Sequence, residues 1–237
     1  MQFSKEYYLR ASDFDKNETL TPRAILELFQ DAAGAHAEEI GIGFHELLNK
    51  NLLWVITRTK FVIEKKIERY STVKIKTWPL SPQRFIFRRE YVMYNADGEV
   101  AVRGSADWMV INSETRTLTS GESVFPANAE YITELSLDEK LRKIRDIEGE
   151  VTESAATPKF CDIDLNGHVN NTRYADFAIN AINPDKRKIK SFQIDYHKEV
   201  LEGEELKLTV TENAETYVVK GENTEGEKKF TCEVIFL

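Results

Sequence analysis

The sequence is poor in cysteine. Only Cys161 and Cys232 occur among 237 residues, which is too few for a disulfide framework, and they lack the paired spacing of a zinc site. We therefore expect two reduced thiols that fill small apolar strand positions, and no bound metal.

Long hydrophobic runs are also missing. The longest uninterrupted apolar stretches, such as 52–56, stop at about five residues, whereas a helix that spans a membrane needs about 20. The first fifteen or so residues contain neither an apolar secretory core nor an acid-poor, Arg-rich targeting pattern. The sequence therefore predicts no membrane span and a cytoplasmic protein.

Positive charge is in the minority. Thirty-two Lys and Arg against 40 Asp and Glu give a net charge of −8, which disfavours a nucleic-acid binder that works by bulk charge. The 41% of hydrophobic and 30% of charged residues are typical of a folded globular chain and exclude a disordered one. Several enzyme classes lose support too, because no GxSxG, GxGxxG, P-loop or HExxH motif is present.

What the sequence does contain is an internal repeat. Residues from Ser12 align with residues from Cys161 at an offset of 149, and they share an Asp-x-Asp-x-Asn frame and the apolar spacing of a following helix. In both copies the pattern predicts a strand (7–14 and 160–163), a helix (about 21–41 and 170–182) and several further strands. We infer an α+β protein with two copies of one unit, at 1–118 and 158–237. A polar segment at 119–157 joins them, with helical character only at 136–147.

The densest polar cluster is 162–171, directly before the second helix. Asp162, Asp164, Asn166 and Gly167 fit the first, third, fifth and sixth positions of a calcium-binding loop. Arg173 stands where that loop needs a bidentate Glu, so we reject the calcium interpretation.

An active-site loop is the other functional interpretation. Asp164, Asn166 and His168 alternate along extended backbone and would project to one side. The backbone N–H groups of Val169 and Asn170, at the start of the helix, could hold an oxyanion. The structural alternative is that Asp164 and Asn166 only form a turn and cap the helix.

The two copies differ at informative positions. The first copy keeps Asp15 and Asn17 but has Thr19 opposite His168, and a second alignment at offset 133 places Lys66 opposite Glu199. Only the second copy therefore carries both a His and a spare carboxylate.

These residues resemble a known family. Asp164-x-Asn166-x-His168-Val-Asn-Asn, followed by Asp195-Tyr-x-Lys-Glu199, is similar to motifs of the acyl-acyl carrier protein (ACP) thioesterases of plants and bacteria, as are the stretches 51–58 and 108–118. The resemblance covers nearly the whole chain. It implies a tandem hotdog fold with two long helices, each wrapped by an antiparallel sheet, and the two sheets joined into one.

The resemblance also implies hydrolysis of fatty acyl-ACP without metal or cofactor, with Asp164, Asn166, His168 and Glu199 as the catalytic residues. Plant members carry a Cys directly after the Glu, but Val200 occupies that position here, which excludes a thiol mechanism at this residue. Either Glu199 or Asp164 could activate water or attack the thioester directly, and the sequence does not choose between them.

We expect the acyl chain and the carrier protein to bind outside the catalytic loop. We expect the first copy to hold the acyl chain along its helix, through Ile25, Leu28, Phe29 and Ala32. Because ACP is acidic, a basic cluster should receive it, and the candidate cluster consists of Lys186, Arg187, Lys188 and Lys190. The alternatives are an acyl-coenzyme A thioesterase, a 3-hydroxyacyl dehydratase of the same fold, and a non-catalytic acyl- or carrier-binding module; assembly as a homodimer is left open.

Overall fold

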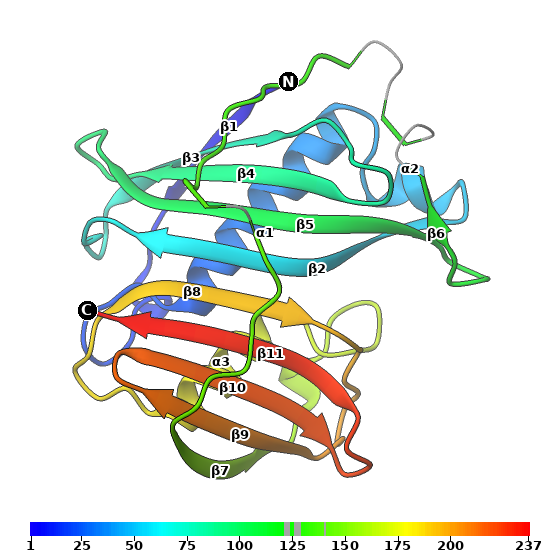
Figure 1. Ribbon diagram of the computed structural model, residues 1–237. Helices are drawn as coiled ribbons and strands as arrows, with labels where there is room; N and C mark the ends of the chain where they lie inside the picture. Colours follow the sequence, from blue (N-terminus) through cyan, green and yellow to red (C-terminus); the bar gives the residue numbers. More distant parts are fainter. Residues whose placement is uncertain (121–123, 126–128, 140) are drawn as a thin grey trace.

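The computed structural model describes residues 1–120, 124–125, 129–139 and 141–237, and its strands form one large antiparallel sheet (Figure 1). The α-helices are α1 (Pro22–Glu39), α2 (Phe44–Leu48) and α3 (Arg173–Ile182). The strands are β1 (Phe3–Tyr8), β2 (Leu52–Ile63), β3 (Thr72–Pro79), β4 (Phe87–Tyr94), β5 (Val100–Asn112), β6 (Leu118–Thr119), β7 (Glu150–Ala156), β8 (Ile189–Tyr196), β9 (Leu206–Asn213), β10 (Thr216–Asn223) and β11 (Lys228–Phe236).

The two copies meet in the middle of the sheet. The strand order is β1-β3-β4-β5-β2-β8-β11-β10-β9-β7, with β6 added to β5. Strands β2 and β8 pair from Arg58↔Asp195 to Val62↔Ser191, and the rings of Phe61 and Phe192 stack across this seam with centroids 5.3 Å apart. Both rings belong to one apolar core that runs through the two copies.

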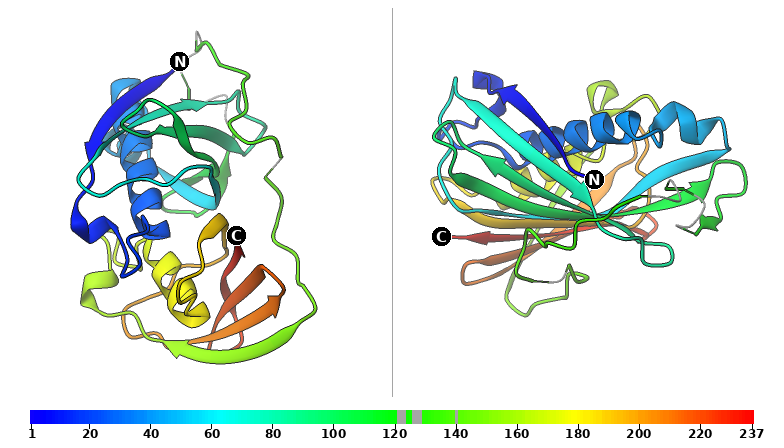
Figure 2. Two further views of the ribbon diagram at one scale, coloured as in Figure 1. Left: turned by 90° about the vertical axis from the view of Figure 1, so that its left-hand side faces the viewer. Right: turned by 90° about the horizontal axis from the view of Figure 1, so that it is seen from above.

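The two faces of the sheet are covered differently. Helices α1 and α3 lie on one face, and described residues between β6 and β7 cross the other (Figure 2). That segment is fixed by buried polar contacts, since the Ser136 N–H donates to the buried Glu90 carboxylate at 2.9 Å and the Ile144 N–H donates to Asp195 at 2.9 Å.

Among the described residues, no helix has both the length and the apolarity that a membrane crossing requires.

Helix α1 follows the sequence pattern closely. The Thr21 hydroxyl accepts a hydrogen bond from the Ala24 N–H at 3.1 Å, and Pro22 occupies the first helical position, as expected of a helix start. Its core-facing side chains include Ile25 and Phe29, both at most 2% exposed.

The expectation of two long helices was wrong. Helix α1 has 18 residues, but α3 has only 10. Helix α3 begins late because the Asn170 side chain accepts the Thr172 N–H at 2.9 Å and holds the chain in a turn. It ends at Ile182 because Asn183 adopts a left-handed conformation (φ 48°) and the following Pro184 cannot continue the helix.

The ends of both copies also differ from expectation. The chain at Ala11–Asp13 and Phe160–Asp162 forms short 3-10 helices instead of strands. Residues 136–139 and 141–147 form no helix, while Lys140 lies outside the described residues, and strand β7 was not predicted at all. Strand β7 is almost entirely exposed at the sheet edge, so it lacks the alternating apolar pattern by which a strand is recognised.

Candidate active site

The loop at 162–170 is a tight turn built by its own polar residues. The Asp164 N–H donates to the His168 carbonyl at 2.9 Å, and the Gly167 N–H donates to the Asp164 carbonyl at 3.1 Å. Gly167 has φ +84°, a conformation that glycine adopts without strain. The Asp164 carboxylate accepts the Asn166 N–H at 2.8 Å, which fixes the turn from inside.

The first copy contains the same turn. The Asp15 carboxylate accepts the Asn17 N–H at 2.8 Å, and the Asp15 N–H donates to the Thr19 carbonyl at 2.9 Å. The residues that flank the turn pair as an isolated bridge in both copies, Phe14 with Leu20 in the first and Ile163 with Val169 in the second. Each residue of the second bridge lies 149 positions after its counterpart in the first. The two turns lie on opposite sides of the molecule (Figure 1). Both Asp residues therefore have an architectural role, whatever else Asp164 does.

The second copy adds a histidine between two carboxylates. His168 Nδ1 lies 3.8 Å from Asp164 Oδ1, and His168 Nε2 lies 3.6 Å from Glu199 Oε1. The side chain of Glu199 is 49% exposed, against 19% for Asp164 and 22% for His168. Three of the four predicted catalytic residues thus come together at the protein surface, with Glu199 the most open to solvent.

Glu199 is fixed through its backbone while its carboxylate stays accessible. It follows strand β8, and the largely buried Lys229 ammonium donates to its carbonyl at 3.1 Å. The next residue, Val200, is fully buried and donates its N–H to the Tyr174 hydroxyl at 3.2 Å. Burial raises the pKa of this tyrosine, which keeps it a neutral phenol at the base of the site.

The N-terminal copy contributes a residue that the sequence did not mark as functional. Arg116, in the turn between β5 and β6, places Nη1 3.4 Å from Glu199 Oε1. Its φ of +57° shows that the turn holds it in the left-handed region. No sequence pattern pointed to this contact, because the two residues lie 83 positions apart.

Two of the predicted groups do not have the expected contacts. Asn166 is exposed, and its side-chain amide makes no hydrogen bond with any residue that the structure describes. The Val169 N–H donates to the Val200 carbonyl and the Asn170 N–H to the Asp162 carbonyl, both at 2.8 Å. These two N–H groups are therefore occupied, because helix α3 begins after them, and this arrangement does not support the predicted oxyanion role.

A small cavity is lined mainly by the first copy. It occupies about 10 Å³ between helix α1 and the sheet of the first copy. Its lining residues are Leu26, Phe29, Gln30, Ile56, Thr59, Tyr91, Ala106, Trp108, Thr172 and Tyr196. The last two belong to the second copy, and the Tyr196 hydroxyl donates to the Asn171 carbonyl at 2.9 Å. Both copies therefore line the cavity, and Asp164, His168 and Glu199 are not among its lining residues.

Only one predicted acyl-chain residue lines this cavity. Phe29 does, stacked on Tyr91 with centroids 4.5 Å apart. Ile25 and Ala32 are fully buried in the core and Leu28 is half-buried, and none of the three is a lining residue. The sequence pattern identified the buried face of α1 but not which part of it borders a space.

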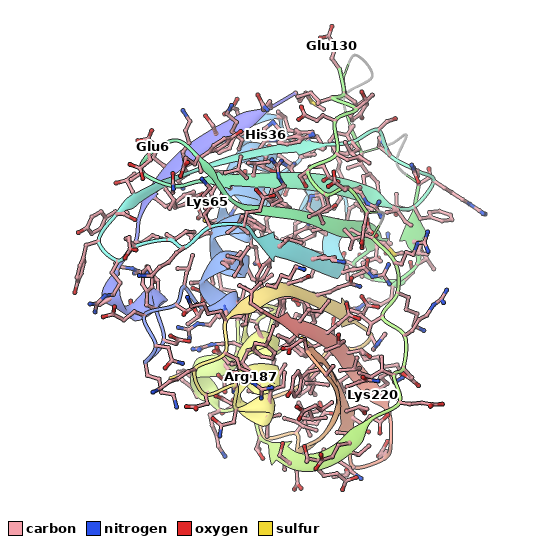
Figure 3. The ribbon with its side chains drawn as sticks, turned by 60° about the vertical axis from the view of Figure 1, so that its left-hand side comes forward. Glu6, His36, Lys65, Glu130, Arg187 and Lys220 are labelled. Atoms are coloured by element: carbon pink, nitrogen blue, oxygen red, sulfur yellow. The ribbon has the colours of Figure 1, made fainter. Side chains whose placement is uncertain are left out.

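The predicted carrier-docking cluster lies away from the site. Lys186, Arg187, Lys188 and Lys190 stand at the start of β8, while Glu199 follows its end. Along a strand of this length the separation is roughly 23 Å. Arg187 also packs over the rings of Tyr217 and Phe236, on the C-terminal half of the molecule (Figure 3). This position does not support docking close to the catalytic loop.

The part of the chain that the structure describes contains no candidate metal site. No group of three or more His, Cys, Asp or Glu side chains there is placed to hold a metal ion. The cysteines are unpaired thiols, Cys161 exposed and Cys232 buried, and burial raises the pKa of the Cys232 thiol.

The fold and the turn together define a class, the tandem hotdog proteins. A crystal structure of an acyl-ACP thioesterase from Bacteroides thetaiotaomicron superposes with a TM-score of 0.87 at 24% identity, covering 100% of this chain and 98% of that one. The 12:0-ACP thioesterase from Umbellularia californica gives a TM-score of 0.82 at 21% identity, covering 100% and 97%. At these identities the structures establish the fold.

Sequence comparison identifies the family. The profile of the acyl-ACP thioesterase N-terminal domain matches residues 1–127, and that of the C-terminal domain matches residues 145–235. The chain belongs to the acyl-ACP thioesterase family, as the sequence motifs predicted.

Its relatives include plant enzymes. A palmitoyl-acyl carrier protein thioesterase of Gossypium hirsutum chloroplasts is 27% identical over 250 residues, which cover 98% of this chain and 59% of the relative. The Arabidopsis thaliana enzyme of the same name is 26% identical, covering 83% and 52%. The chain therefore spans a little over half the length of these curated relatives.

Proposed function

We propose that this protein hydrolyses the thioester of fatty acyl-ACP and releases a free fatty acid and the carrier thiol. The observation that carries the proposal is the placement of His168 between Asp164 and Glu199 in only one of two otherwise equivalent turns. Family membership supports it.

Glu199 is the better candidate for the group that activates water. Its carboxylate is 49% exposed, whereas Asp164 is engaged with the Asn166 N–H inside the turn. In this mechanism Glu199 takes a proton from water as the water oxygen bonds to the thioester carbon. The carbon–sulfur bond then breaks, and the departing thiolate takes up a proton to give the free thiol.

His168 and Asp164 act together in this proposal. One imidazole nitrogen faces Glu199 and the other faces Asp164, so the carboxylate of Asp164 can orient the ring as it interacts with the substrate carbonyl. Asn166, on the open side of the turn, would contact substrate or water rather than protein. The distances of 3.6–3.8 Å leave room for the tightening that accompanies substrate binding.

We further propose a division of labour between the copies. The first, 1–118, supplies most of the cavity for the acyl chain, and the second, 158–237, supplies the catalytic residues. The segment 119–157 connects them. Arg116 and Tyr196 cross this division, since each contributes to the other copy's site. Acyl carrier protein remains the proposed partner, and a cytoplasmic location and a homodimer remain predictions.

The test uses the repeat as its own control. Asp164→Asn, His168→Ala and Glu199→Gln should each lower the rate by roughly 10²-fold or more. Asp15→Asn makes the same change in the equivalent turn of the first copy and should leave the rate near that of the wild type. Free fatty acid should be measured by mass spectrometry, because the exposed Cys161 would react with thiol reagents.

The outcome separates the alternatives as well. Near wild-type rates in all three variants would show that the active site lies elsewhere. Faster turnover of acyl-coenzyme A than of acyl-ACP would favour a coenzyme A thioesterase. An enoyl product from a hydroxyacyl substrate would indicate a dehydratase, and binding without turnover of any substrate would indicate a non-catalytic module.

A further inference from the structure

The small cavity between helix α1 and the sheet contains polar groups that a plain hydrocarbon chain would not satisfy. Thr59 on β2 is 2% exposed, and its hydroxyl has no hydrogen-bond partner among the described residues. It lines the cavity directly. Burying a hydroxyl without a hydrogen-bond partner costs folding free energy, so a bound group that pairs with Thr59 would be stabilising.

A strand irregularity places Ile56 and Thr59 on the same, inner face of β2. The pairing of β2 with β5 shifts between Ile56 and Arg58, so that Thr57 is an extra residue, which breaks the alternation of faces. Ile56 and Thr59 both line the cavity, while Arg58 points to the outer face and pairs with Asp195. Without the bulge, Ile56 and Thr59 would lie on opposite faces of β2, whereas Thr59 already shares the inner face with the buried Phe61 by ordinary alternation.

A second polar atom lies on the same wall. The buried indole N–H of Trp108 approaches the Tyr91 hydroxyl but makes no hydrogen bond of normal geometry. Burial raises the pKa of Tyr91 to about 12, so its hydroxyl is uncharged. The side chain of Gln30 also borders the cavity. The cavity wall therefore presents one hydrogen-bond donor, the Trp108 N–H, and one group that both donates and accepts, the Thr59 hydroxyl.

We propose that this cavity selects an acyl chain that carries a hydroxyl group, so that the preferred substrates are hydroxyacyl thioesters. The inference rests on the proposed hydrolysis and specifies its substrate class. A chain hydroxyl accepts from the Trp108 N–H and donates to the Thr59 oxygen, which satisfies both protein groups. A saturated chain leaves both unpaired. The position of the hydroxyl along the chain is the one that brings it beside Thr59 when the thioester lies at His168.

The competing occupant is a single water molecule. A cavity of about 10 Å³ holds no more than one water molecule, so an acyl chain enters it only if the lining side chains move apart, whereas a water could bridge Thr59 and Trp108 as the cavity stands, without any role in specificity. The two explanations differ in what happens when the hydroxyl of Thr59 is removed.

The decisive variant is Thr59→Val, which keeps the shape of the side chain and removes its hydroxyl. Saturated and hydroxyacyl-ACP substrates of equal length, with the hydroxyl placed at successive carbons, are compared by kcat/KM. We expect the wild type to favour one hydroxyl position over the saturated chain. Thr59→Val should reduce that preference by about three- to tenfold, partly by improving the saturated substrate.

The matched control is Thr57→Val on the same strand. The Thr57 hydroxyl donates to the Asp107 carbonyl at 3.0 Å, outside the cavity, so this variant should keep the wild-type preference. A wild type that favours saturated chains at every hydroxyl position would overturn the proposal. So would a hydroxyl preference that Thr59→Val leaves unchanged, which would assign the polar wall to a bound water.

A binding experiment separates this inference from the proposed activity. Free hydroxy and saturated fatty acids are titrated into wild-type and Thr59→Val protein by calorimetry, which requires no turnover. Tighter binding of the hydroxy acid by the wild type, lost in Thr59→Val, would support the selective cavity even if hydrolysis were absent. Hydrolysis without any difference in binding or rate between the two acid classes would reject the selective cavity and leave the activity intact.

Discussion

Arg116 of the first copy holds Glu199 of the second, with 3.4 Å between Nη1 and Oε1. Glu199 in turn lies 3.6 Å from His168. The candidate catalytic carboxylate is thus positioned from both halves of the repeat, although both side chains are about half-exposed. A single copy of the unit would lack this contact.

This relationship predicts that Arg116→Ala lowers kcat/KM by about tenfold through misplacement of Glu199. Arg116→Lys should recover part of the loss, because it restores the charge without the fork of the guanidinium. The loss should appear in kcat more than in KM. Arg69→Ala, which removes an equally exposed pair with Glu18, is the control and should have no effect. An unchanged kcat in Arg116→Ala would mark the contact as an ordinary surface ion pair.

The seam between the copies depends on a buried ion pair. Arg58 Nε and Asp195 Oδ1 are 2.6 Å apart, and Asp195 is 2% exposed. It also accepts the Ile144 N–H. Asp195→Asn leaves the Arg58 charge with only the longer contact to Asp107 at 3.9 Å, so we expect the free energy of unfolding to fall by about 3 kcal/mol, measured by urea denaturation.

A surface pair gives the comparison for the seam. Lys66 and Glu68 are 3.0 Å apart with side chains 60% and 70% exposed, and Glu68→Gln should cost less than about 1 kcal/mol. Equal effects of the two variants would mean that the seam pair adds nothing beyond a surface contact.

The cysteines should be dispensable for activity. Cys161 is exposed and Cys232 is buried, and burial raises the pKa of Cys232, so alkylation should modify Cys161 alone in the folded protein. The Cys161→Ser, Cys232→Ser double variant should hydrolyse acyl-ACP at close to the wild-type rate. A folded but inactive double variant would reinstate a thiol mechanism and argue against Glu199.

A buried histidine should make stability depend on pH. Burial, assisted by the adjacent Arg89 guanidinium, lowers the pKa of His36 from 6.5 to about 4. Arg89 donates to His36 Nδ1 at 2.9 Å, and His36 is 2% exposed in the N-terminal half (Figure 3). Between pH 6.5 and 4 the unfolded chain binds a proton that the folded protein excludes. Its contribution to stability is therefore complete above pH 6.5 and declines toward pH 4.

The measurement compares free energies of unfolding at pH 7 and pH 4.5. The wild type should lose about 1–3 kcal/mol more over this range than His36→Gln, whose side chain can still accept from Arg89 but does not titrate. His45→Gln, at an exposed position, should follow the wild type. A pH dependence shared by all three proteins would assign the effect to other groups.

Local patterns in the sequence were sufficient for most of the fold. The repeat at offset 149 predicted two equivalent units, and the structure shows their turns residue for residue, from Asp15 and Asp164 outward. Central strands were predictable because they are rich in β-branched and aromatic residues. The polar edge strand β7 carried no such signal, and α3 is shorter than its apolar pattern because Asn170 forms a capping turn instead of joining the helix.

The sequence determined by itself that this chain has two α+β copies, and that only the second combines a histidine with a spare carboxylate, because these facts are local composition and spacing. Tertiary structure alone decided that Arg116 reaches Glu199 and that Val169 and Asn170 have no free N–H groups. It also decided that Thr59 turns into a cavity with Trp108. Each of these depends on a strand pairing or a bulge that joins distant residues, and no spacing along the chain encodes such contacts.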